Sequence, residues 1–169
     1  MGAPWWIVVP LLFAGALAQA SLVPALGFVA VRPDLVLQLV VVWSVLRGAR
    51  QALPWGFLGG LALDLLSGGP FGTAALALVL VAFCSSAGAS RVFRPNALLA
   101  VVIVFLASVL YGLLFLVLLR THHYPVDWRG TVRHTVVPSA ILNAALAPLP
   151  YALLRRLERR TRRSVAVEW

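Results

Sequence analysis

The chain has 169 residues, of which 62% are hydrophobic and only 11% are charged, and its mean hydropathy is +0.95. Soluble domains are about half apolar and about a quarter charged, so this composition excludes an ordinary soluble fold, which would expose large apolar patches. The formal net charge is +9, but no aromatic and basic platform for nucleic acid accompanies it. We therefore expect an integral membrane protein with no nucleic-acid partner.

Apolar runs long enough to be helices in a bilayer occur six times along the chain. They cover residues 5–29, 33–46, 52–66, 70–89, 95–119 and 135–154. The first is expected to be a retained span and not a cleaved signal, because no basic residue precedes it. The second and third are short for a hydrocarbon core of about 30 Å, so they lie inside the bundle or the bilayer thins around them. Their tight connection predicts an antiparallel hairpin, with Pro54 in the first turn of the third helix.

The predicted fold class is an all-α integral membrane protein, a six-helix transmembrane bundle. Residues 1–154 would form one six-span transmembrane domain, and residues 155–169 an arginine-rich cytoplasmic tail. With six spans, ten of the fourteen basic residues fall on the side of the chain ends and four on the other side. The positive-inside rule then places both termini in the cytoplasm.

The basic tail is the most charged part of the chain. Its six arginines are Arg155, Arg156, Arg159, Arg160, Arg162 and Arg163. Each basic residue near an anionic leaflet contributes about 1 kcal/mol, so we expect the tail to anchor the chain at the lipid surface. Docking of a cytoplasmic partner is the alternative.

Two acids lie near the outer ends of predicted helices. Asp64 falls one turn before the end of the third helix, where the helix dipole disfavours an anion, so it needs a cation or hydrogen-bond donors. We predict that it meets Arg32 or the N–H groups at residues 69–71. A turn-fixing role is favoured, with ligand binding, proton handling and partner contact as alternatives. Asp34 falls in the first turn of the second helix, where we expect it to satisfy free N–H groups.

Glycines cluster in and after the third predicted helix. Gly56 and Gly60 form a GxxxG pair, which lets helix backbones approach closely in lipid. Packing within the chain is favoured over dimerisation or docking of a partner's helix. Gly68, Pro70 and Gly72 predict a tight outer turn, with Pro70 beginning the fourth helix.

Few other polar residues interrupt the apolar runs. Asn143 in the sixth run is expected to hydrogen-bond between helices, and the single Cys84 to be a small buried side chain. The outer loop at residues 120–134 carries an adjacent histidine pair, but neighbouring histidines point in different directions, so we expect a solvated loop and no metal site. No nucleophile and base are spaced for catalysis, so we expect neither an enzyme nor a cofactor.

Three segments in the first half of the chain form a recognisable combination. Arg32-Pro33-Asp34-Leu35 opens an apolar helix, a basic turn follows at Arg47-Gly48-Ala49-Arg50, and a glycine-rich helix ends within residues 60–72. In this combination the chain resembles the MreD family of bacterial rod shape-determining membrane proteins. The sixth span with its prolines and the long arginine tail have no counterpart in that resemblance.

That resemblance implies a non-enzymatic scaffold or regulatory subunit of the cell-elongation complex in the bacterial inner membrane. The expected main partner is MreC, whose single transmembrane helix it would bind. RodA and a class B penicillin-binding protein would be further partners, MreB an indirect one, and a homodimer stays open. The resemblance also implies a fold like the S components of energy-coupling-factor transporters. A subunit that binds a small, vitamin-like substrate is therefore the alternative function.

Overall fold

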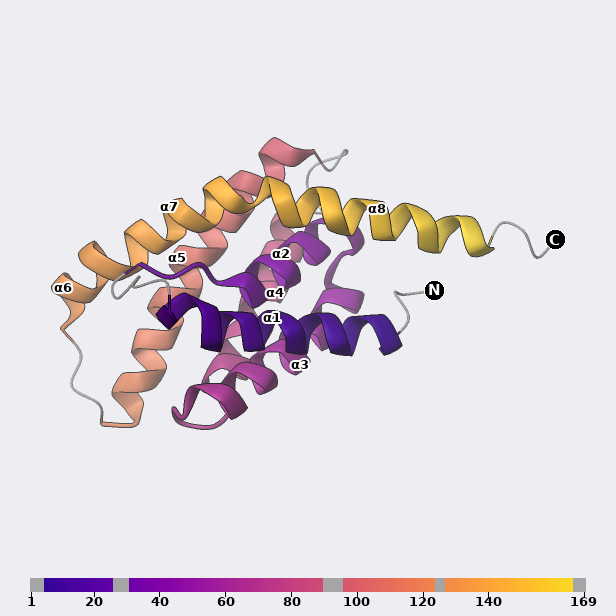
Figure 1. Cartoon of the computed structure of the whole chain (residues 1–169). Coiled ribbons are helices and arrows are strands. Elements are labelled where there is room, and N and C mark those ends of the chain that lie inside the picture. The colour runs from indigo at the N-terminus through magenta and orange to yellow at the C-terminus, as the bar shows by residue number, and fades with distance from the viewer. Residues whose placement is uncertain (1–4, 26–30, 90–95, 124–126, 166–169) are drawn as a thin grey trace.

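The computed structural model describes residues 5–25, 31–89, 96–123 and 127–165, and side chains over 6–21, 31–89, 96–123 and 127–158. All regular structure in these residues is helical, so the all-α prediction is confirmed (Figure 1). The elements are α1 (Trp5–Ala25), α2 (Leu35–Arg47), α3 (Ala49–Ser67), α4 (Thr73–Ala89), α5 (Ala97–Thr121), α6 (Trp128–Thr131), the π-helical η1 (Val132–Val136), α7 (Val137–Leu146) and α8 (Pro148–Val165).

Helix α2 is the centre of the bundle. Its ten residues from Val36 to Val45 are all buried, and it packs against α1, α3, α4, α5 and α8. A helix of 13 residues is about 20 Å long, well short of the hydrocarbon thickness. Because other helices surround it, this short helix has little contact with lipid, which is the first of the two arrangements expected for it.

The connection between α2 and α3 is shorter than the sequence suggested. Gly48 alone separates the two helices, with φ +76°, a backbone conformation that glycine adopts without strain. Helix α3 therefore begins at Ala49 and runs for 19 residues, or about 28 Å. Pro54 consequently lies inside α3, past its first turn, so its predicted place was wrong.

The turn between α3 and α4 contains two glycines in the left-handed region, Gly68 at φ +65° and Gly72 at φ +91°. Since Gly72 holds the chain out of a right-handed helix, α4 begins only at Thr73. The expectation that Pro70 begins this helix was therefore wrong by three residues. Cys84 on α4 is exposed, which also corrects the prediction that it is buried.

The sixth predicted span is broken. α6, η1 and α7 follow one another directly, and the chain then bends by 46° before α8. Pro148 is the first residue of α8, where its missing N–H costs nothing, so the proline-rich region starts a new helix. α8 continues to Val165, through the boundary at 154/155 that was expected to separate the bundle from the tail.

Helix α5 is the clearest candidate for a membrane crossing. Among the described residues, α5 is long and apolar enough to cross a bilayer alone, and Trp128–Leu146 with Pro148–Glu158 would make a second crossing if counted as one bent span. The remaining apolar helices are shorter: Trp6–Ser21, Leu35–Arg47 and Thr73–Ala89. In Figure 1, α1 begins and α8 ends on the same side of the molecule.

Candidate functional site

Asp64 forms a compact corner where α3 turns into α4. The side chain is buried, and its carboxylate accepts hydrogen bonds from the backbone N–H groups of Gly72 (3.0 Å), Ala74 (2.9 Å) and Ala75 (3.1 Å). These donors open α4, where N–H groups lack partners within the helix and the dipole favours an anion. The predicted N–H contact thus forms at residues 72–75 and not at 69–71.

The alternative partner predicted for Asp64 was wrong. No ion pair joins it to Arg32 within the described part of the chain. The three backbone donors already satisfy both carboxylate oxygens, so a cation is not needed to stabilise the charge.

The glycine pair lies directly against the start and middle of α4. A Cβ atom at Gly60 would collide with the backbone of Ala75, and one at Gly56 would lie 2.9 Å from the carbonyl oxygen of Leu78. Such backbone-to-backbone contact is what small residues permit in helix pairs. Since α4 covers this face, the pair is not available to a partner's helix. The alternative that Gly56 and Gly60 dock such a helix was therefore wrong.

A second polar cluster joins four helices at the same end of the bundle. Asn143 on α7 is fully buried, and its side-chain oxygen accepts from the Asp34 backbone N–H (2.9 Å) and from the Gln38 amide (3.1 Å). Its side-chain nitrogen donates to the Asp34 carboxylate (3.4 Å) and to the Ser108 hydroxyl on α5 (3.2 Å). One amide therefore connects α2, α5 and α7.

Asp34 completes the cluster from the N-terminal end of α2. Its carboxylate accepts a hydrogen bond from the Gln19 side chain of α1 at 3.0 Å. It occupies the N-cap position, but its side chain makes no capping hydrogen bond, so the expected role at the first turn was wrong. Gln19 reaches that turn instead, because its oxygen accepts from the Val36 N–H at 3.4 Å. We call Gln19, Asp34, Gln38, Ser108 and Asn143 the outer network.

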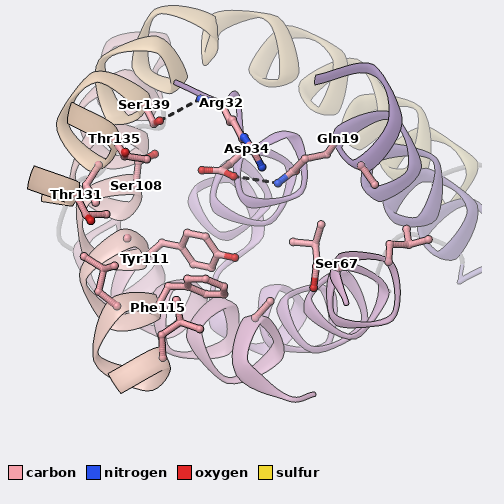
Figure 2. A pocket seen from close by; sticks show the side chains of 18 residues that line it. Gln19, Arg32, Asp34, Ser67, Ser108, Tyr111, Phe115, Thr131, Thr135 and Ser139 are labelled. Atoms are coloured by element: carbon pink, nitrogen blue, oxygen red, sulfur yellow. Dashed lines mark hydrogen bonds between the residues drawn. The ribbon is translucent and has the colours of Figure 1, made fainter. Parts of the chain in front are cut away.

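Beside the outer network lies a cavity of about 540 Å³. Its lining comes from the C-terminal parts of α1 and α3, the residues just before α2, the start of α4, the second half of α5, and the segment from α6 to α7. Figure 2 shows Gln19 and Ser67 facing Ser108, Thr131, Thr135 and Ser139 across this space. A space of this size with a few polar groups among apolar walls is typical of small-molecule sites. We call it the outer cavity.

Two polar side chains of the outer cavity have unused hydrogen-bonding capacity. The hydroxyl of Tyr111 points into the space, and no partner for it is found in the described part of the chain (Figure 2). The Arg32 backbone N–H donates to Ser139 at 3.2 Å, but its exposed guanidinium forms no ion pair with any described carboxylate. Both groups can therefore form hydrogen bonds with a ligand that enters the cavity.

The opposite end of the bundle is fixed by different chemistry. Arg47, the last residue of α2, pairs with Glu158 of α8 at 3.3 Å, and its guanidinium lies over the Trp43 ring. Trp43 in turn stacks on Trp55 with ring centroids 4.5 Å apart. These contacts attach α8 to the α2–α3 hairpin.

The basic tail is described only in its first part. Arg155 and Arg156 are exposed on α8, with Arg155 over the ring of Tyr151 at 5.7 Å. The side chains of Arg159, Arg160, Arg162 and Arg163 lie outside the described residues, although their backbone belongs to α8.

Several residues of the outer network and cavity had no place among the predicted site residues. Gln19, Ser108, Tyr111 and Ser139 were missed. A weak signal was present, since each is a polar residue within a strongly apolar run, and such residues usually face the bundle interior. In the first run, Gln19 lies between Ala18 and Ala20, a pattern that is also typical of a signal cleavage site.

These observations define a class of protein: an all-helical fold with apolar side chains around its outside and polar groups gathered within, as in helical membrane proteins. A family model for rod shape-determining protein MreD matches residues 3–159. The chain therefore belongs to the MreD family, whose members are bacterial membrane proteins that determine cell shape. This family is not a known enzyme family. No curated protein and no solved structure matches the chain.

Proposed function

We propose that the chain is a non-enzymatic scaffold or regulatory subunit of the bacterial elongation complex, which supports peripheral peptidoglycan synthesis and so maintains rod shape. The observation that carries this proposal is the family match over residues 3–159, nearly the whole chain. The packing is in keeping with a scaffold. Hydrogen bonds, glycine contacts and an ion pair fix the helices at both ends of the bundle, so its surface can present a constant shape to partners.

The proposal includes the arrangement in the inner membrane. We propose six crossings with both termini in the cytoplasm, one transmembrane domain over residues 1–154, and an arginine-rich tail over 155–169 at the lipid surface. Two observations support it. α1 begins and α8 ends on one side (Figure 1), and the exposed Arg155 and Arg156 lie at the middle of α8. The positive-inside rule assigns that side to the cytoplasm.

The proposed main partner is MreC, bound through its transmembrane helix, with RodA, a class B penicillin-binding protein and, indirectly, MreB in the same complex. Because α4 covers Gly56 and Gly60, the partner's helix would contact a lipid-facing surface instead. Among the described helices, α5 offers a long apolar row for such a contact. Its exposed members are Leu98, Val102, Leu106, Leu113 and Val117.

Pull-down of the tagged full chain from mild detergent tests this role. The expected companion is a single-span protein with a periplasmic domain, and the mass of the purified particle would also reveal a homodimer. Recovery of an ATPase and its coupling subunit would contradict the scaffold role.

Disulfide cross-linking locates the contact. The exposed native Cys84 is first replaced by serine, and single cysteines are then placed at Leu106 on α5, Leu80 on α4 and Phe57 on α3. Each variant is combined with a cysteine in the transmembrane helix of MreC and treated with a mild oxidant. All three positions are exposed, so a cross-link to MreC at Leu106 alone is the expected result. Equal cross-linking at all three would argue against a defined docking face.

One observation favours the alternative function. The outer cavity has the size and mixed lining of a ligand site, so a small-molecule binding subunit similar to the S components of energy-coupling-factor transporters is the second candidate. Uptake assays separate the two functions. Transport of a vitamin-like substrate together with an ATPase would support the carrier, and normal uptake with loss of rod shape on deletion would support the scaffold.

A further inference from the structure

The outer cavity carries an inference that does not rest on the scaffold role. It lies where α1 and α3 end and α2 begins, at the end of the bundle opposite the Arg47–Glu158 pair. This is the level at which a bilayer's apolar core meets its polar headgroups if the bundle spans the membrane. A ligand there can place a polar group among the cavity's hydroxyls and an apolar group against its hydrocarbon walls.

The charged groups in the lining indicate the ligand's polar part. Arg32 and Asp34 both line the cavity, but no ion pair joins them. Within the described residues, the Arg32 guanidinium has no hydrogen-bond partner, so its donors can bind an anionic group. The Asp34 carboxylate accepts one amide hydrogen bond on each oxygen and retains lone pairs for another donor. The lining thus offers one place for an anion and another for a cation.

The two charged groups of the lining have opposite signs. One guanidinium and one carboxylate give the lining no net charge, so a ligand with a single charge would meet a like charge at one of the two groups. A ligand that carries both signs satisfies both. Tyr111 adds a hydroxyl and an aromatic ring, and its ring lies 5.9 Å from that of Phe115, so an ammonium group near Asp34 would also meet an aromatic surface.

Beside these groups and the hydroxyls, the lining has an apolar wall. Leu63 and Leu66 of α3 face the cavity from one side, and Phe115, Leu116 and Leu119 of α5 from the other. Burial of an aliphatic group there contributes about 0.8 kcal/mol for each methylene. A fully polar ligand would leave this wall against water.

We propose that the outer cavity binds a small zwitterion with an aliphatic substituent, with its anionic group at Arg32 and its ammonium group between Asp34 and Tyr111. Two sources share this chemistry: the headgroup of a zwitterionic phospholipid such as phosphatidylethanolamine, and a free zwitterion such as leucine.

The test uses the full chain purified in a neutral detergent. Native mass spectrometry measures retention of phosphatidylethanolamine against phosphatidylglycerol, which lacks the ammonium group. Calorimetry measures leucine against isocaproate, which lacks the ammonium group, and leucinamide, which lacks the carboxylate. Preferential binding of the zwitterion in either arm supports the proposal, and the arm in which it occurs identifies the source.

Substitutions then assign the site. Arg32→Gln removes the charge at an exposed side chain and should weaken binding about tenfold, since charge-assisted hydrogen bonds are lost. Tyr111→Phe keeps the packing and should weaken binding about threefold through loss of one hydroxyl. Arg129→Gln, at an exposed arginine outside the cavity lining, is the matched control and should bind as the unaltered chain does. Melting temperatures verify that each variant is folded.

Three results would overturn the proposal: no binding of either zwitterion, equal binding of the singly charged analogues, or full binding by Arg32→Gln. None of these results would contradict the scaffold role, which is tested separately by recovery of MreC.

Discussion

Two regions at the same end of the bundle stabilise an acid in different ways, Asp64 being buried and Asp34 half-buried. In the α3–α4 corner, Asp64 is bonded by three backbone N–H groups that follow it by eight to eleven residues. In the outer network, Asp34 is bonded by side chains, one of them 15 residues earlier and the other 109 residues later. The first region is a local turn, and the second joins parts of the chain that are remote in sequence.

The difference shows two ways to stabilise a charge in an apolar bundle. The corner uses backbone donors that exist in any helix start, so only the acid and its spacing to the next helix are required. The network needs amides and hydroxyls from α1, α5 and α7 to arrive together, which makes it dependent on the whole fold. We therefore expect the corner to govern packing of one helix pair, and the network to govern the arrangement of all four helices.

Substitution of Gly60 should have the largest effect on stability, because it disrupts the close backbone contact between α3 and α4. In Gly60→Ala the new methyl group meets the Ala75 backbone, which cannot move aside as a flexible side chain can. Overpacking of this kind is expected to cost about 2–3 kcal/mol of unfolding free energy. Denaturation in mixed micelles, followed by circular dichroism, measures it.

Gly88 on α4 is the matched control for Gly60. Apart from its own helix backbone, no atom of the described residues lies within 4 Å of the position that its Cβ would occupy. Gly88→Ala should therefore leave stability unchanged or raise it by about 0.5–1 kcal/mol through better helix propensity. Equal losses in the two variants would show that the close approach of α3 and α4 is not what the glycine serves.

Replacement of Asp64 should have the next largest effect. Asp64→Asn keeps one acceptor oxygen and puts an amide donor against the remaining N–H groups, so we expect a loss of about 1–2 kcal/mol. Asp127→Asn is the control, because Asp127 bonds one N–H group, that of Gly130, at an exposed helix start and should lose less. A larger loss at Asp127 than at Asp64 would contradict the role given to the corner.

Two serine substitutions should have the smallest effects on stability. They compare a hydrogen bond between helices with one inside a single helix. Ser108→Ala removes a hydroxyl that accepts from Asn143 on another helix, and should cost about 1 kcal/mol. Ser86→Ala removes a hydroxyl that donates to the Ala82 carbonyl within α4, whose oxygen keeps its helical partner, so the cost should be under about 0.5 kcal/mol. The same micelle denaturation compares them, and reversed costs would count against the network.

The corner could be predicted from the sequence, whereas in the network only the hydrogen bonding of Asn143 between helices was predicted. Glycines and an acid at the end of an apolar run predict a turn with capping donors, and only the donors' positions were shifted. For Asp34, local rules favoured its own helix start, but its carboxylate bonds two side chains of other helices. Composition could not identify those partners, because hydrogen bonds over more than 100 residues depend on how the helices pack. The break before α8 was missed because hydropathy stays high across Pro148.

The most direct test of the idea that buried polar groups join remote helices is a double-mutant cycle between Asp34 and Asn143. Unfolding free energies of Asp34→Ala, Asn143→Ala and the double variant should show a coupling of about 1 kcal/mol, because the two side chains share a hydrogen bond. The Asp34 backbone N–H, which also donates to Asn143, stays in Asp34→Ala and adds nothing to the coupling. A cycle between Asp64 and Asn143, which share none, should be additive within about 0.5 kcal/mol. Additivity in the Asp34–Asn143 cycle would contradict the idea that polar side chains join remote helices.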